Sequence, residues 1–132
     1  MILGSHTGTD DGLASVFQKA QEHGADCLQL FSKASQHWNA APLKPVEIED
    51  FKTARQEAGT PPVLVHDSYL INLASPDPEK LERSIEAYAQ ELQRCHQLGI
   101  EDLNMHPGAA TDGQEVAGLN RVADALLEAY LL

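Results

Sequence analysis

The stretch that decides the fold reads PPVLVHDSY, at residues 61–69. Its centre, from Val63 to Val65, is wholly apolar and contains two β-branched residues, which is typical of a strand covered on both faces in a parallel sheet. A histidine, His66, follows at once, so this strand is expected to end on a polar side chain. Because functional side chains in parallel α/β folds gather at the carboxyl ends of the strands, His66 is a candidate site residue.

Three more strands are predicted outward from this one, at residues 2–6, 27–31 and 102–106, and each is followed by apolar residues at helical spacing. Repeated strand–helix units form parallel sheets. Four such units make half of an eight-unit (β/α)8 TIM barrel, which needs about 250 residues, and a four-stranded open α/β sheet is the alternative. The fourth helix is expected to bury Val116, Leu119, Val122, Ala123, Leu126, Leu127 and Tyr130.

The composition predicts one soluble, cytoplasmic domain over residues 1–132. Hydrophobic residues make up 42% of the chain, and no apolar run approaches a membrane span or a signal peptide. The two cysteines, Cys27 and Cys95, lack metal-binding spacing and are expected to be reduced thiols. The net charge of −11, from 20 acidic and 9 basic residues, argues by itself against a nucleic-acid partner.

A second histidine, His106, ends the fourth predicted strand as His66 ends the third. Neighbouring strands lie about 4.8 Å apart, so two imidazoles at such ends can converge on one metal ion. Alternatively, each histidine caps its strand and bonds a loop. Two histidines do not complete a site, because a catalytic zinc takes three ligands from protein.

Two sequence motifs make the assignment of the His66 and His106 pair more specific: HDSYLINL at residues 66–73 and NMHPG at residues 104–108. Both closely resemble signatures of the endonuclease IV family, the zinc-dependent apurinic/apyrimidinic endonucleases of DNA base-excision repair. Further stretches agree in order and spacing, so the resemblance covers essentially the whole chain: GSH at 4–6 before Gly12-Leu13, LFSK at 30–33 with Trp38, AAPL at 40–43 and QRCHQLG at 93–99.

This resemblance implies a TIM barrel with three zinc ions that hydrolyses the phosphodiester 5′ to an abasic site in double-stranded DNA. His66 and His106 match two zinc ligands of the family, although a histidine pair also suits Mn or Fe. His6 matches a position expected to support the ligands or a loop; alternatively, it is a structural histidine with its hydrogen bonds satisfied. The residues that match DNA-contacting loops are Tyr69 and Leu70 in one loop and Gln36 and His37 in another. Taken alone, Tyr69 could be a packing aromatic at the start of a loop, and His37 is expected to be a solvated loop histidine.

The sequence departs from the family in two ways. Gln36 stands where the family often has an arginine, so less positive charge faces the DNA. The family's other zinc ligands, several of them carboxylates, come from strands five to eight, which residues 1–132 do not include. We expect an amino-terminal half barrel, truncated after the fourth helix and inactive alone, that requires a carboxy-terminal half or self-association.

Two other functions stay open at this stage. Related TIM barrels isomerise or epimerise sugars with divalent ions, and the residues of the DNA loops would then be incidental. A metal-poor half barrel could also act as a non-catalytic module that binds a partner through its open sheet edge.

Overall fold

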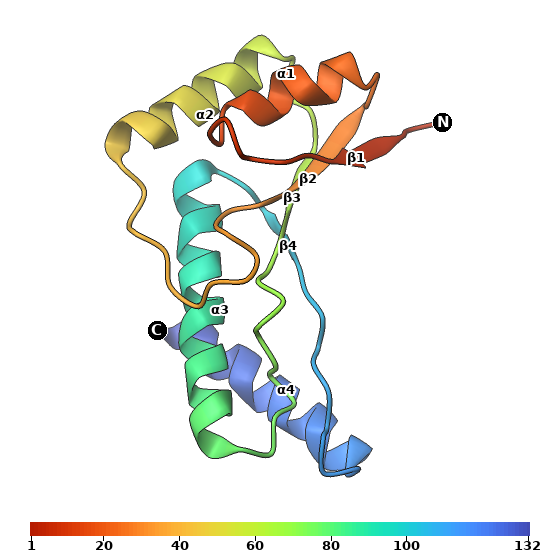
Figure 1. Ribbon diagram of the computed structural model, residues 1–132, viewed down its shortest axis with the longest axis vertical. Coiled ribbons are helices and arrows are strands. Elements are labelled where there is room, and N and C mark those ends of the chain that lie inside the picture. The colour runs from red at the N-terminus through yellow and green to blue at the C-terminus, as the bar shows by residue number, and fades with distance from the viewer. The chain divides into compact units, whose positions relative to one another are not determined.

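A computed structural model of the protein describes residues 1–132 and contains four strand–helix units (Figure 1). The strands pair in parallel in the order β1-β2-β3-β4, which confirms the predicted α/β class with four parallel βα units. In chain order the elements are β1 (Gly4–His6), α1 (Ser15–Glu22), β2 (Cys27–Phe31), α2 (Pro45–Glu57), β3 (Val63–His66), α3 (Pro78–Leu98), β4 (Asp102–Asn104) and α4 (Glu115–Leu131).

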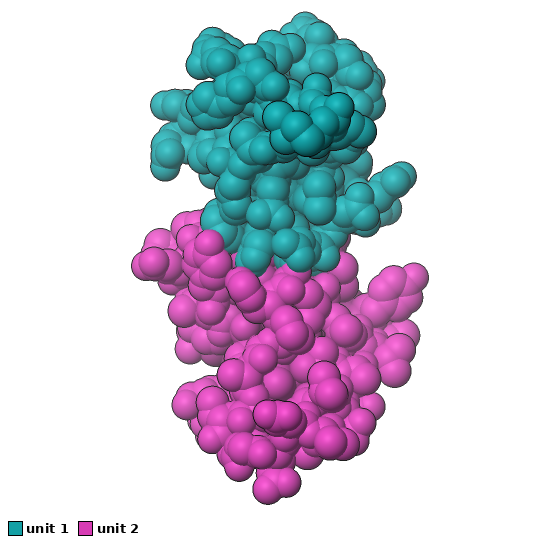
Figure 2. All heavy atoms as spheres, turned by 90° about the vertical axis from the view of Figure 1, so that its right-hand side faces the viewer, with its two compact units in different colours: residues 1–32, 41–66, 94–104 teal, residues 33–40, 67–93, 105–132 magenta.

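The chain divides into two compact units, coloured separately in Figure 2. Unit 1 comprises Met1–Ser32, Ala41–His66 and Arg94–Asn104, and it contains the whole sheet with α1 and α2. Unit 2 comprises Lys33–Ala40, Asp67–Gln93 and Met105–Leu132, and it contains α4 and most of α3.

The core of unit 1 lies on one face of the sheet. Leu28 and Leu30 of β2 and Val63 and Val65 of β3 are at most 3% exposed. They belong to one cluster with Phe17 of α1 and Phe51 of α2, whose rings pack 5.0 Å apart. Because each fully buried side chain of this size contributes about 1.5–3 kcal/mol, this face fixes the register of the strands. The alternate residues of the strands therefore lie on the opposite face.

The prediction for the buried face of the fourth helix is wrong in part. Val122 is buried, but four other predicted positions are 66–81% exposed: Val116, Leu119, Leu127 and Tyr130. The helix instead buries small residues, Gly118, Ala125 and Ala129, together with Val122. A Cβ on Gly118 would lie 2.7 Å from the Cβ of Ala110, so the close backbone approach selects the small-residue face.

The fourth strand is shorter than predicted. β4 ends at Asn104 because Asn104 pairs with His66, the last residue of β3, and the ladder goes no further. β1 begins at Gly4 and not at Ile2, for it pairs with β2 from Cys27 onward. None of the helices is long and apolar enough to cross a membrane.

Candidate functional site

The polar face of the sheet in unit 1 carries a row of side chains that the strand register brings together. Phe31, His66 and Asn104 are partners across β2, β3 and β4, and His6 of β1 is the partner of Gln29 of β2. These residues alternate with the buried aliphatic positions, so they share the face opposite the core.

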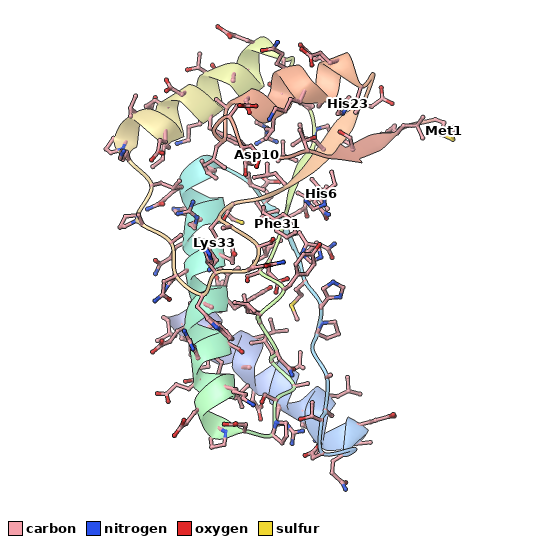
Figure 3. The ribbon with its side chains drawn as sticks, viewed as in Figure 1. Met1, His6, Asp10, His23, Phe31 and Lys33 are labelled. Atoms are coloured by element: carbon pink, nitrogen blue, oxygen red, sulfur yellow. The ribbon has the colours of Figure 1, made fainter.

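His66, predicted at the end of the third strand, is its last residue and is 8% exposed. Its ring lies edge-on to Phe31, with 5.5 Å between ring centroids, and 6.5 Å from the ring of His6. Figure 3 shows His6 beside Phe31, and their ring centroids are 4.7 Å apart. Burial, and to a lesser degree the neighbouring His66, hold the pKa of His6 below its ordinary value. The lowered pKa favours the neutral imidazole, in which one ring nitrogen donates a hydrogen bond and the other accepts one.

A glutamine links the two ends of this row. The side-chain Nε2 of Gln29 lies 3.0 Å from Nδ1 of His6, and its Oε1 accepts a hydrogen bond of 3.1 Å from Nδ2 of Asn104. Sequence reasoning did not single out Gln29 as functional, although it is the one strongly polar residue inside the apolar run CLQLF. The network spans β1, β2 and β4, so it fixes the side chains at the carboxyl edge of the sheet.

In unit 2, two of the predicted site residues lie together. The ring of Tyr69 is 57% exposed and its centroid lies 6.2 Å from that of His106, which is exposed as well. His106 follows β4 by two residues and does not end it, which corrects its predicted place on the strand. Leu70, next to Tyr69, is half-buried.

The two predicted DNA-contacting loops are joined to each other within unit 2. The backbone N–H of Tyr69 donates to the carbonyl of Ser35 at 3.0 Å, and the hydroxyl of Ser68 donates to the same carbonyl at 2.8 Å. Ser35 directly precedes Gln36 and His37, whose side chains are exposed. The structure thus brings the predicted loop residues onto connected segments.

A buried ion pair lies at the start of the loop that carries Gln36 and His37. The Nζ of Lys33 is 3.5 Å from Oε1 of Glu91 on α3, and both side chains are 1% exposed. The same ammonium donates to the backbone carbonyl of Trp38 at 3.0 Å. The guanidinium of Arg83 stacks over the ring of Trp38, 4.5 Å from its centroid. The loop at residues 33–38 is therefore held at both of its ends.

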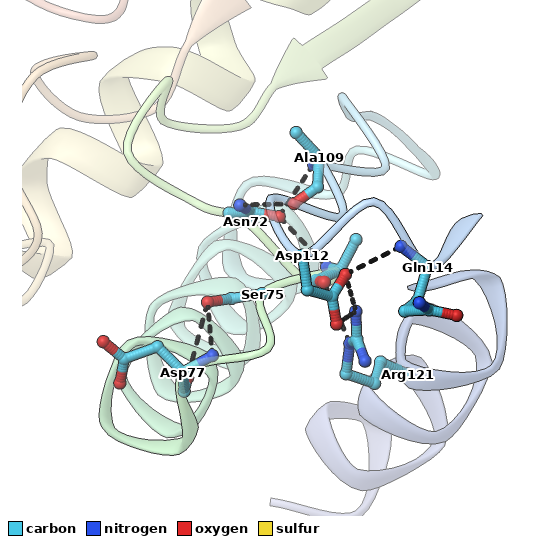
Figure 4. A network of polar contacts seen from close by, with 8 residues as sticks. Asn72, Ser75, Asp77, Ala109, Asp112, Gln114 and Arg121 are labelled. Atoms are coloured by element: carbon cyan, nitrogen blue, oxygen red, sulfur yellow. Dashed lines mark hydrogen bonds and ion pairs between the residues drawn. The ribbon is translucent and has the colours of Figure 1, made fainter. Parts of the chain in front are cut away.

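Asn72 holds the segment that follows His106 through hydrogen bonds to Ala109, which Figure 4 shows. The Oδ1 of Asn72 accepts hydrogen bonds from the backbone N–H groups of Ala74 and Ala109, at 3.1 and 2.9 Å. Its Nδ2 donates to the carbonyl of Ala109 at 3.1 Å. Gly108, with φ +103°, lies so close that a Cβ there would be 2.1 Å from Oδ1 of Asn72. Asn72, which belongs to the HDSYLINL motif, thus holds Ala109, the residue directly after the NMHPG motif.

The metal prediction is only partly matched by these residues. His66 belongs to unit 1 and His106 to unit 2, so their convergence on one ion stays a prediction. Imidazole is a suitable zinc donor, but residues 1–132 contain no group of three or more His, Cys, Asp or Glu side chains arranged for a metal. The donor type fits zinc, and the number of donors does not.

The fold and the motifs agree with known proteins. Residues 17–131 match the sequence family described as a xylose isomerase-like TIM barrel. The chain belongs to this family. Within it, the probable endonuclease 4 of Chloroflexus aurantiacus is 48% identical to the chain over 124 residues, which cover 94% of the chain and 44% of that protein. The resemblance to endonuclease IV is confirmed by this similarity.

Solved structures give the same result. The crystal structure of endonuclease IV from Thermus thermophilus superposes with a TM-score of 0.83 at 30% identity, over 96% of this chain and 45% of that one. A D-psicose 3-epimerase from Clostridium cellulolyticum H10 has a TM-score of 0.67 at 14% identity, over 98% of this chain and 47% of that one, which shows the shared fold alone. The chain spans less than half the length of these two endonuclease relatives.

Proposed function

We propose that this chain forms part of a zinc-dependent endonuclease that cleaves DNA 5′ to abasic sites, as in base-excision repair. One observation supports this proposal most directly: the exposed ring of Tyr69 lies beside His106, on a loop joined to the segment that carries Gln36 and His37. An exposed aromatic ring can stack on or beside bases, and an imidazole next to it can bind a metal at the same phosphate. The similarity to the probable endonuclease 4 supports the same function.

In this proposal His66 and His106 each supply one imidazole to the metal centre. A catalytic zinc requires three protein ligands, so the remaining ligands lie outside residues 1–132, in the part of the barrel that the relatives have and these residues do not span. A bound zinc would polarise the phosphate and lower the pKa of a bound water. The contribution of this chain is to hold two histidines and two DNA-contacting loops in place.

A chimera tests the function with a complete ligand set. Residues 1–132 would replace the matching segment of the Chloroflexus aurantiacus protein, and the product would be incubated with a duplex that contains one abasic site. We expect incision on the 5′ side of the abasic site, sensitive to EDTA and absent from an intact duplex. We expect the 132-residue chain alone to be inactive. A folded, zinc-loaded chimera that epimerises a ketose and does not incise the duplex would exclude the endonuclease.

Alanine variants in the chimera test the two ligands. His66→Ala and His106→Ala should each reduce the zinc content measured by elemental analysis and abolish incision. His96→Ala is the matched control, because His96 is an exposed histidine on α3 with no proposed role. If the zinc content of either ligand variant equals that of the control, that histidine is not a ligand.

A further inference from the structure

The side chains of Asn104 and Gln29 form a hydrogen-bonded chain that ends on a ring nitrogen of His6. Three strands contribute one residue each, and the two contacts are 3.1 and 3.0 Å long. Gln29 is the register partner of His6, whereas Asn104 belongs to β4 and makes its contact with Gln29 across β3. The contact between His6 and Asn104 is therefore indirect and passes wholly through one amide.

The polarity of this chain follows from what each group can do. A primary amide has one end that only donates and one end that only accepts. Asn104 donates to Oε1 of Gln29, so Gln29 presents its Nε2–H group to Nδ1 of His6. Nδ1 must then be the acceptor, and in a neutral imidazole the proton is on the other nitrogen, Nε2.

We propose that Asn104 and Gln29 act as an amide relay that determines which ring nitrogen of His6 is protonated, and that they hold His6 as a hydrogen-bond donor through Nε2. His6 lies beside His66 at the carboxyl edge of the sheet. If the proposed endonuclease function holds, on which this last step rests, the donor is available to a phosphodiester oxygen of DNA. Asn104 and Gln29 are positioning residues in this arrangement, because they act through His6.

The relay predicts that a substitution at Asn104, which does not contact His6, changes the tautomer of His6. In Asn104→Asp the new carboxylate can only accept, so Gln29 must turn its Nε2 toward that carboxylate and its Oε1 toward His6. Nδ1 of His6 must then donate, and the tautomer changes. Gln29→Glu imposes the same change directly, since a carboxylate next to Nδ1 can only accept. Two variants at different sites thus lead to one outcome.

Imidazole tautomers are measured by long-range ¹⁵N–¹H NMR correlation, at mildly alkaline pH, on the 132-residue chain. The chain has six histidines, and the His6 signals are assigned by their loss in His6→Gln. We expect the proton on Nε2 in the unmodified chain and on Nδ1 in both variants. Asp102→Asn, an exchange between the same two side-chain types two residues earlier in β4, should leave the His6 signals unchanged.

Two results would overturn the relay: a proton on Nδ1 in the unmodified chain, or the same tautomer in the unmodified chain and in both folded variants. The link to DNA is tested separately in the active chimera. There Asn104→Asp should lower kcat/KM about 10-fold or more with unchanged zinc content, the effect of losing one hydrogen bond to a charged group. A changed tautomer with unchanged kcat/KM would refute the role in DNA binding and leave the relay intact. An inactive chimera with the expected tautomers would refute the proposed function alone.

Discussion

Removal of one partner from the buried pair of Lys33 and Glu91 should strongly destabilise the protein, and Lys33→Met tests this. Both side chains are 1% exposed, so neither charge is screened by water. Replacing the lysine removes its positive charge from beside a buried carboxylate and deletes its hydrogen bond to the carbonyl of Trp38. Breaking a buried pair from one side costs about 3–5 kcal/mol, a large part of the roughly 5–15 kcal/mol that stabilises a whole domain.

The same substitution at an exposed pair gives a matched control. Lys80 lies 3.5 Å from Asp77, the same distance as in the buried pair, but its side chain is 74% exposed. Lys80→Met should therefore cost about 0–1 kcal/mol. Both variants remove a lysine ammonium from an ion pair of the same length, so the larger cost at Lys33 measures what burial adds: an unpaired buried carboxylate and a lost hydrogen bond to the carbonyl of Trp38.

Denaturant unfolding, followed by far-UV circular dichroism, supplies the free energies. The double variant Lys33→Met/Glu91→Leu should recover most of the loss, because apolar replacement of both charges is often neutral or stabilising by about 1–4 kcal/mol. The reasoning is refuted if Lys33→Met costs no more than Lys80→Met. It is refuted equally if the double variant is as unstable as the sum of its two single variants.

Three further changes follow from local geometry. Gly108→Ala should cost roughly 2–5 kcal/mol in denaturant unfolding, because it strains the backbone and displaces the hydrogen bonds of Asn72. Gly113→Ala is its control: with φ +74° and open space around it, it should cost only about 1–2 kcal/mol, and equal costs would contradict this account. The backbone N–H of Gln114, and secondarily Arg121, lower the pKa of Asp112. The stabilising effect of the Asp112 carboxylate should therefore be present above pH 3.8 and be lost as the pH falls through the lowered pKa. A pKa of this carboxyl measured by NMR at or above the ordinary value for aspartate would disprove this. Leu127→Gln, at a position 68% exposed, should change the free energy of unfolding by less than about 0.5 kcal/mol, and a larger loss would show that α4 buries this face.

The strands that were predicted correctly are those whose own side chains indicate that they are buried. β3 occupies residues 63–66 and β2 residues 27–31, as predicted, because their aliphatic side chains can be buried only in a sheet covered by helices. The end of β4 could not be predicted in this way. It depends on where β3 ends, because the last backbone pairing between the two strands joins His66 and Asn104. The end of β4 is therefore set by another segment of the chain.

The face of α4 was mispredicted for a related reason. Hydrophobicity favoured the large residues, among them Leu119 and Leu127, whereas the structure buries Gly118 and Ala125. Which face of α4 is buried depends on how closely the backbone of a neighbouring segment approaches it. A hydrophobic pattern in the sequence does not predict that distance.

The same distinction applies to the candidate site. His66 was placed correctly at the end of β3, since a polar residue that closes an apolar run is visible in the sequence. Gln29 and Asn104, which form the network beside it, are separated by 75 positions along the chain and meet only through the strand register. A glutamine within an apolar strand was the single signal that could have drawn attention to the network.

The net charge of −11 must still be reconciled with the proposed DNA substrate. At least five of the nine cationic side chains are used within the fold. They are Lys19 with Asp11, Lys33 with Glu91, Arg55 with the carbonyl of Gly99, Arg94 with Ser32 and the carbonyl of Ala41, and Arg121 with Asp112.

Few cations of this chain are therefore available to neutralise phosphates, and its share of DNA binding should come from stacking and neutral hydrogen bonds. In the active chimera, Tyr69→Ala should weaken binding of abasic duplex by about 1–3 kcal/mol, because Tyr69 is exposed and aromatic. The loss should be the same at low and high salt, since no counterion is released by a neutral ring. Affinities measured by fluorescence anisotropy over a salt series decide the point. A Tyr69→Ala loss that shrinks as salt rises would mean that the loop acts through the phosphate charge, and the assignment of Tyr69 as a stacking residue would be wrong.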